Sequence, residues 1–301
     1  MEKNKIIKTI YTLIILILFG IVFFIGMFFP SNLKVNSFKE STKISHAQKI
    51  IGSEANKEGV IPTLYISGSG GNVSPLNSLL GGIFPNIDPK NDCLTIQVNI
   101  TNHDKLTVSG NINPDDKSPI IEFATVKGTD KGELYSRAIK VAIRYLVTHY
   151  NYTEINIVGF SSGGTGAIYY MIDNESNKSL PKVDKFISLD GEYNSEGQLQ
   201  FGESLQSVIA NGPILKTPMY RYIAKNYRKI NPSTEIYFME GNCNFYKQTD
   251  GAVSWADTFS IYHLLVENKN VVSMYLYPTK YSHGNIPKEP LVQNYIKKII
   301  Y

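Results

Sequence analysis

The chain has 301 residues, of which 43% are hydrophobic and 19% are charged, and its formal net charge is +4. This composition predicts one domain of about 250 residues with a full core plus a short appendage, and it excludes a disordered chain. Three lysines against one glutamate in the first eight residues contribute +2, so the small remaining charge indicates no nucleic-acid partner. Two cysteines without CxxC spacing exclude a disulfide scaffold and a zinc site, and no metal or cofactor is expected.

Residues 10–29 form an uninterrupted apolar run near the amino terminus. As a helix this run would be about 30 Å long, which matches the hydrocarbon core of a bilayer. A cleavable signal peptide is the alternative, but its apolar region is about 7–15 residues long and is followed by small residues, which this chain lacks. The lysines before the run place the amino terminus in the cytoplasm. We therefore predict a cytoplasmic tip and transmembrane anchor over 1–30, a stalk and entry helix over 31–59, and an extracellular domain over 60–301.

Short apolar runs alternate with longer amphipathic segments after residue 60, a pattern typical of a mostly parallel sheet with helices on both faces. The predicted strands cover residues 61–67, 94–100, 106–112, 120–126, 155–158, 182–189, 235–239 and 272–277. The predicted helices cover residues 74–80, 131–150, 165–172, 252–267 and 287–300. The segment 192–232 is too long for a simple connection, and we predict that it forms a cap or lid.

A G-x-S-x-G pattern, Gly159-Phe160-Ser161-Ser162-Gly163, lies between a predicted strand and a predicted helix. The pattern alone is weak, and a glycine-rich turn that only packs is the alternative. In the strand and helix context, however, such a turn strains the serine and exposes its hydroxyl above the sheet. Ser161 is therefore the predicted nucleophile, and the backbone N–H of Ser162 is a predicted oxyanion donor.

A serine nucleophile needs a histidine base and a carboxylate that orients the histidine, and in α/β-hydrolases these follow in the order Ser, acid, His. Of the five histidines, three precede Ser161 and His263 lies within a predicted helix. His283 follows the last predicted strand, so we predict that it is the base. A histidine of an ordinary surface loop is the alternative.

Three aspartates compete for the role of the acid. Asp250 is preferred, because it lies in a loop whose following glycine permits a tight turn beside the loop of the last strand. Asp190 remains an alternative, although it could simply form a turn with the glycine after it. Asp257 is predicted to be a solvated helix residue.

The loop Gly68-Ser69-Gly70-Gly71 follows the first predicted strand. Backbone amides of such a loop can stabilise the oxyanion that forms during acyl transfer, and we predict that Ser69 supplies the second donor. A phosphate cradle is a poor alternative, because the loop lacks the lysine of a P-loop and does not complete a dinucleotide fingerprint.

The apolar anchor and the segments GSGGN, GFSSGG, KTPMY, TDGAVSWADTFSI and YSHGN together resemble a bacterial family of cell-surface α/β-hydrolases long described as a domain of unknown function. The resemblance extends from about Thr63 to the end of the chain. It implies an α/β-hydrolase fold in which Asp250 and His283 complete the triad. Two positions depart from the family: relatives often carry histidine where this chain has Ser67 and Phe160.

These features predict a serine hydrolase at the cell surface that cleaves carboxylic esters through an acyl-serine intermediate. Lipid-like esters are plausible substrates because the anchor would hold the domain near the bilayer. Peptidases and thioesterases use the same triad and remain alternatives. A non-catalytic surface protein that keeps the fold for binding is the alternative from another class, and the sequence predicts no oligomeric state.

Overall fold

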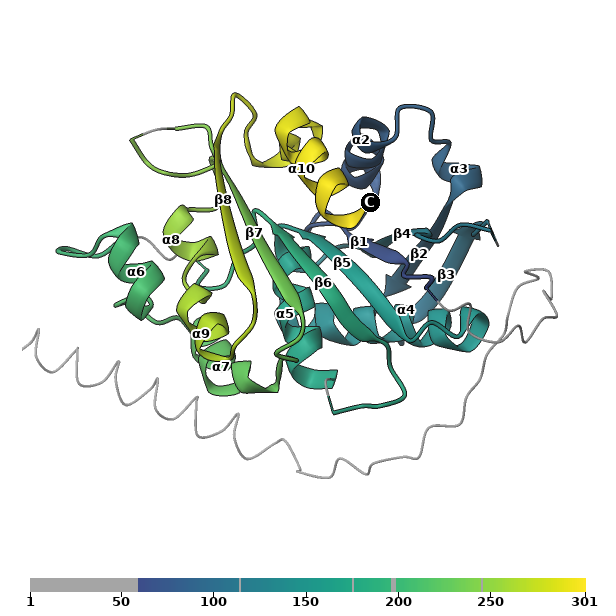
Figure 1. Cartoon of the computed structure of the whole chain (residues 1–301), viewed down its shortest axis with the longest axis horizontal. Coiled ribbons are helices and arrows are strands. Elements are labelled where there is room, and N and C mark those ends of the chain that lie inside the picture. The colour runs from purple at the N-terminus through teal and green to yellow at the C-terminus, as the bar shows by residue number, and fades with distance from the viewer. Residues whose placement is uncertain (1–58, 114, 175, 196–198, 245) are drawn as a thin grey trace, which may run out of the picture. The chain divides into compact units, whose positions relative to one another are not determined.

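The computed structural model describes residues 59–301 except 114, 175, 196–198 and 245, and an eight-stranded sheet lies at its centre (Figure 1). The strand order is β3-β2-β4-β1-β5-β6-β7-β8, and every neighbouring pair is parallel except the antiparallel pair β2–β3. The strands are β1 (Thr63–Ile66), β2 (Cys93–Asn99), β3 (Lys105–Gly110), β4 (Ile120–Thr125), β5 (Glu154–Phe160), β6 (Lys182–Leu189), β7 (Glu235–Asn242) and β8 (Val272–Pro278).

Helices cover both faces of this sheet (Figure 1). They are α2 (Ser74–Ile83), α3 (Pro89–Asp92), α4 (Gly132–Tyr150), α5 (Ser162–Asn174), α6 (Leu205–Asn211), α7 (Pro218–Asn226), α8 (Trp255–Thr258), α9 (Tyr262–Glu267) and α10 (Pro290–Ile300), with 3-10 helices η1 (Tyr227–Lys229) and η2 (His283–Lys288). One buried apolar cluster joins the sheet to α4, α5, α7 and α9, and a second joins it to α2 and α10. The predicted architecture is thus confirmed.

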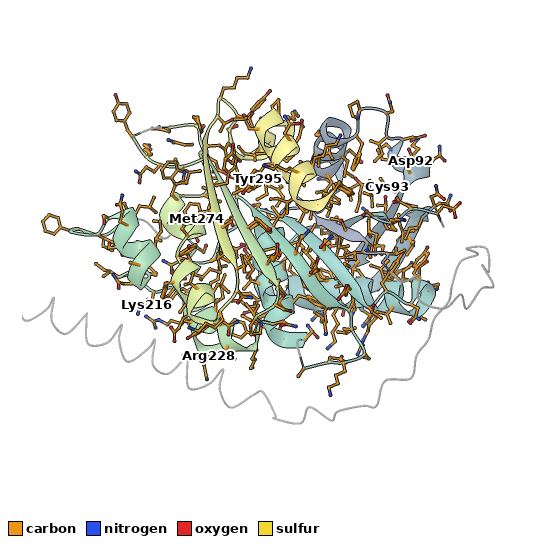
Figure 2. All side chains as sticks on the ribbon, in the orientation of Figure 1. Asp92, Cys93, Lys216, Arg228, Met274 and Tyr295 are labelled. Carbon is orange, nitrogen blue, oxygen red and sulfur yellow. The ribbon has the colours of Figure 1, made fainter. Side chains whose placement is uncertain are left out.

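Burial along the strands explains their apolar sequences. All four residues of β1 and all six of β4 are buried, because helices cover these strands on both faces. The antiparallel edge strand β3 is mostly exposed and is correspondingly polar. At the other edge of the sheet, Tyr295 of α10, which is labelled in Figure 2, stacks on Tyr275 of β8 with ring centroids 4.4 Å apart, and this contact connects the last helix to the last strand.

Two predicted helices are interrupted in the structure. The segment 252–267 contains α8 and α9 rather than one helix, because the chain turns at Phe259–Ile261. The segment 287–300 is helical as α10 only from Pro290, because Glu289 has an extended backbone and its carboxylate accepts a hydrogen bond from the Leu291 N–H as the cap of α10.

The predicted anchor at 10–29 and the predicted stalk at 31–59 lie outside the described residues, apart from Gly59. Within the part of the chain that the structure describes, no helix has the length and apolar character needed to cross a bilayer.

The carboxyl ends of β1, β4, β5, β6, β7 and β8 all meet at one edge of the sheet, because these strands are parallel. In open α/β sheets this edge is where the loops that carry ligand-binding and catalytic groups converge. Each residue of the predicted triad follows one of these strands, so the topology brings together segments more than 100 residues apart in the sequence.

Candidate active site

Ser161 occupies a sharp turn between β5 and α5. Its backbone lies in the left-handed region with φ +55°, and its side chain is 4% exposed. A Cβ atom added at Gly159 would lie 2.7 Å from the Gly164 Cα, and one added at Gly163 would lie 2.6 Å from the Ser67 carbonyl oxygen. Glycine at both positions therefore allows the strand and helix to approach and the strained serine to be held.

The three residues of the predicted triad contact one another. His283 Nε2 lies 2.8 Å from Ser161 Oγ, and His283 Nδ1 pairs with the Asp250 carboxylate. Asp250 is fully buried, and its other oxygen accepts hydrogen bonds from the N–H groups of Ala252 at 2.9 Å and Val253 at 2.8 Å. The His283 N–H also donates to the Asp250 carbonyl oxygen at 2.8 Å. The imidazole is thereby held by both side-chain and backbone contacts.

This arrangement assigns the proton positions on the imidazole. An ionised Asp250 can only accept, so Nδ1 of His283 donates to it and Nε2 is left to accept the Ser161 hydroxyl proton. Burial lowers the pKa of His283, but the hydrogen bond and charge of Asp250, followed by the charges of Asp190 and Glu192, outweigh burial and raise the pKa above its ordinary value of 6.5. A raised pKa favours a base that holds the proton it takes from the serine.

Phe160 contributes to the site in a way that the sequence did not predict. Its ring stacks on the His283 imidazole with centroids 5.1 Å apart. The residue at which this chain departs from the family pattern therefore packs directly against the predicted base. The second departure from the family pattern, Ser67, is buried directly before the glycine-rich loop.

The loop after β1 lies against the nucleophile. A Cβ atom added at Gly68 would lie 3.0 Å from the Ser161 Cβ, whereas the next residue, Ser69, is exposed. Ser162 is the first residue of α5, so its N–H has no partner within the helix. Ser162 thus directly follows the nucleophile, and Ser69 directly follows the glycine that packs against it. The role of both N–H groups in oxyanion binding stays a prediction.

Two neighbours hold the loop after β1 in place. The Tyr135 hydroxyl on α4 donates to the carbonyl oxygens of Ser67 and, at 3.0 Å, Gly68. Gly128 has φ +65°, and an added Cβ atom would lie 1.7 Å from the Ser69 carbonyl oxygen. Neither residue has a sequence signature that predicts this role, because each acts only after distant segments have packed together.

Replacing Gly128 by alanine is expected to displace Ser69 and to lower kcat by about 10²–10³-fold, the loss typical of one oxyanion donor. Gly59→Ala is the matched control: Gly59 also has a positive φ, +88°, but nothing lies within 4 Å of an added Cβ atom. The measurement is kcat on a soluble ester, with circular dichroism to show that both variants fold. Equal kcat values for the two variants would contradict the role of this loop.

The two aspartates that were not preferred are both buried and play structural parts. Asp257 is 3% exposed, and one of its oxygens accepts the N–H groups of Tyr193 at 2.6 Å and Asn194 at 2.5 Å. The prediction of a solvated helix residue is therefore wrong, because Asp257 turns inward to fix the chain after β6. Asp190 is fully buried and does not contact His283 through a hydrogen bond among the described residues.

Asp190, Glu240 and Asp250 form a buried carboxyl cluster in which one oxygen of each lies within 4.8 Å of the others. It is the one group of potential metal ligands that the described residues bring together. Most of its oxygens already accept hydrogen bonds from the protein, and Glu240 Oε1 alone lacks a partner in the described chain. A metal ion needs several free oxygens, so the cluster is better suited to holding protons.

The buried carboxyl groups make stability depend on pH. Burial raises the pKa of Glu122, Asp190 and Asp257 to about 7, and that of Glu240 well above its usual value. The folded chain therefore keeps protons that the unfolded chain releases near pH 4, and stability is lost as the pH rises through the folded values. The raised pKa of His283 acts in the same direction. We therefore expect Tm to be higher at about pH 5 than at about pH 8, as measured by thermal denaturation. A Tm that rises from about pH 5 to about pH 8 would contradict the raised pKa values of these buried groups.

The segment 192–232, predicted as a lid, contains α6 and α7. An open cavity of about 270 Å³ lies between this segment and the start of α4, and its lining includes Asp130, Tyr169, Glu192 and Met219. Burial raises the pKa of Glu192 in this lining, and the charge of His283 lowers it to a smaller extent. On its other side, α7 packs into the core through the buried side chain of Ile223.

Comparison with known proteins identifies the family of the chain. The family described as alpha/beta hydrolase of unknown function (DUF915) matches residues 52–301. The chain belongs to this family. The α/β-hydrolase fold and the family resemblance predicted from the sequence are confirmed.

Solved structures extend this agreement to the fold. The lin2722 gene product of Listeria innocua is 23% identical and superposes with a TM-score of 0.68, over 79% of this chain and 92% of that one. The "putative cell surface hydrolase" of Lactobacillus plantarum is 17% identical and has a TM-score of 0.59, over 80% of this chain and 90% of that one. None of the curated proteins compared with the chain matches it.

Proposed function

We propose that this α/β-hydrolase family member is a serine hydrolase that cleaves carboxylic esters. One observation carries the proposal: His283 lies between Ser161 and Asp250. Its Nε2 is 2.8 Å from Oγ of Ser161, whose backbone is strained, and its Nδ1 pairs with the buried Asp250 carboxylate. A hydroxyl is a poor nucleophile until a base takes its proton, and this geometry supplies both the base and the group that orients it.

The reaction follows from the assigned proton positions. Ser161 Oγ attacks the ester carbonyl carbon as its proton passes to His283 Nε2, and the N–H groups of Ser162 and Ser69 stabilise the oxyanion. The protonated imidazole gives this proton to the departing alcohol, which leaves an acyl-serine. Water then attacks the acyl-serine with His283 again as base, and the acid product and free Ser161 are released. Asp250 stays ionised and stabilises the imidazolium in both steps.

The test of the reaction class uses three substrates with the same acyl group: a butyryl ester, a butyryl thioester and a butyryl anilide. We expect the purified full-length chain to have its highest kcat/KM on the ester. Faster cleavage of the anilide would instead favour a peptidase, and faster cleavage of the thioester a thioesterase. A chain that cleaves none of the three and leaves a fluorophosphonate unreacted would be a binding protein on a hydrolase fold.

The location of the enzyme forms a second part of the proposal. The apolar run at residues 10–29 would anchor the chain in the bilayer with its amino terminus in the cytoplasm, and the domain from residue 60 would lie outside. Lipid-like esters near the bilayer would then be accessible to it, with residues 192–232 as a lid. Trypsin added to intact cells should degrade the domain. Complete protection of the domain, in cells where a control protein exposed on the outer surface is cleaved, would overturn this orientation.

A further inference from the structure

Asp190 is a buried ionisable group close to the triad that the proposed reaction does not use. It follows β6, is 0% exposed, and its backbone lies in the left-handed region with φ +49°. This backbone conformation costs free energy in a residue other than glycine, and hydrogen bonds to both carboxyl oxygens of Asp190 stabilise it here. Oδ1 accepts the Gly241 N–H at 2.8 Å, and Oδ2 accepts the Tyr277 hydroxyl at 3.1 Å.

These two contacts connect Asp190 to the strands that carry the acid and the base. Gly241 lies near the end of strand β7, after which the chain leads to Asp250. Tyr277 lies near the end of strand β8, after which the chain leads to His283. One oxygen of Asp190 also lies within 4.8 Å of one oxygen each of Asp250 and Glu240. Asp190 therefore contacts both strands that lead to the acid and the base, and its carboxyl group lies close to that of Asp250.

Several charged groups act on the Asp250–His283 pair. His283 is acted on by Asp250, Asp190 and Glu192. Asp190 is acted on by burial, which raises its pKa most, and then by Asp250, the Gly241 N–H, His283 and the Tyr277 hydroxyl. Together these effects raise the pKa of Asp190 to about 7, and the pKa of His283 is also raised above its ordinary value.

Glu240 differs from Asp190 in this respect. Burial, followed by the charges of Asp190 and Asp250, raises the pKa of Glu240 well above its usual value, so Glu240 keeps its proton to higher pH than an exposed glutamate does. Its Oε2 is paired with the Thr258 hydroxyl at 2.6 Å. The cluster thus contains one carboxyl that keeps its proton and one, Asp190, whose charge can change.

We propose that Asp190 is a positioning residue of the triad that also controls its acidic limit of activity: its carboxyl group holds the ends of β7 and β8 together and, when ionised, adds negative charge behind the Asp250–His283 pair. This inference rests on the proposed function, since it describes how the base of that reaction is maintained. At low pH, a neutral Asp190 leaves His283 with Asp250 and Glu192 as its charged neighbours. As Asp190 ionises, the imidazolium formed during the reaction is stabilised further.

The experiment measures the pH dependence of kcat/KM for the full-length chain on a neutral ester. Asn at position 190 keeps an oxygen for the Gly241 N–H but removes the charge, so Asp190→Asn should move the midpoint of the acidic limb to lower pH by about half a unit to one unit. Tyr277→Phe removes a hydrogen bond that favours the ionised Asp190, so its midpoint should move in the same direction by less. A lower kcat/KM with an unmoved midpoint in Asp190→Asn would overturn the proposal in favour of a purely structural role.

Two control variants remove other buried carboxyl groups. Glu240→Gln replaces a carboxyl group whose pKa is raised well above its usual value, and Asp257→Asn removes one whose oxygen accepts the N–H groups of Tyr193 and Asn194 rather than a triad group, so neither should move the midpoint. A shift as large in Asp257→Asn as in Asp190→Asn would also overturn the proposal. The titration of the His283 imidazole by NMR, assigned with His283→Gln, tests the same linkage without turnover. Absence of ester hydrolysis by the wild-type chain would refute the proposed function. A midpoint of the His283 titration that Asp190→Asn leaves unchanged would refute the role of Asp190 alone.

Discussion

Replacing His283 by alanine is expected to lower kcat on a soluble ester by on the order of 10⁶-fold, the loss seen when the base of a serine hydrolase is removed. The physical reason is that Ser161 then has no acceptor for its proton, because His283 Nε2 is the group that its hydroxyl contacts, at 2.8 Å. His149→Ala is the matched control: His149 is exposed near the end of α4 and touches Tyr145 rather than the triad.

Residues that act as a unit lose their contribution together, which gives this prediction a second arm. Ser161→Ala should lose about as much activity as His283→Ala, and the double variant should lose no more than either single variant. Multiplication of the two losses in the double variant would show that Ser161 and His283 act independently. In that case the proposed proton transfer between them would be wrong.

Replacing Asp250 by asparagine is expected to lower kcat by about 10⁴-fold, because an amide in place of the carboxylate favours the wrong tautomer of the base. The carboxylate of Asp250 accepts from Nδ1 of His283, whereas an asparagine amide can donate to Nδ1 and leave the proton on Nε2, where it blocks the attack. The measurement is kcat across the pH range, since restoring activity at high pH would indicate a change of tautomer rather than of fold.

Asp190→Asn separates the two aspartates that the sequence left as alternatives. The Asp190 oxygens accept from the Gly241 N–H and the Tyr277 hydroxyl rather than from the imidazole, so its replacement should lower kcat far less than that of Asp250. A greater loss of kcat in Asp190→Asn than in Asp250→Asn would reverse the assignment of the acid. Thermal denaturation of both variants separates these effects from a loss of folding.

The pattern of the sequence predicts much of this molecule because local features dominate there. The buried strands are short apolar runs, and the elbow at Ser161 is a local motif whose flanking strand and helix can be recognised. The order Ser161, Asp250, His283 then requires only that the last strands be parallel neighbours, which the structure confirms.

The sequence predicts less wherever the outcome depends on contacts between distant segments. Asp257 looks like a solvated residue in a polar helix, but the backbone of Tyr193 supplies donors that draw it into the core. The break between α8 and α9 accompanies this inward turn. The hydrogen bond from the Tyr135 hydroxyl to the loop after β1 likewise joins residues 67 positions apart. It depends on tertiary packing, and no periodic pattern in the sequence predicts it.

Covalent labelling by a fluorophosphonate is the most direct measurement of the central claim, because it requires a serine activated by its base and does not depend on the natural substrate. We predict that the full-length chain becomes labelled at Ser161, located by mass spectrometry of peptides, and that Ser161→Ala is unlabelled while the neighbouring Ser162→Ala keeps the reaction. Absence of labelling in the folded wild-type chain, or equal labelling in Ser161→Ala, would contradict the account.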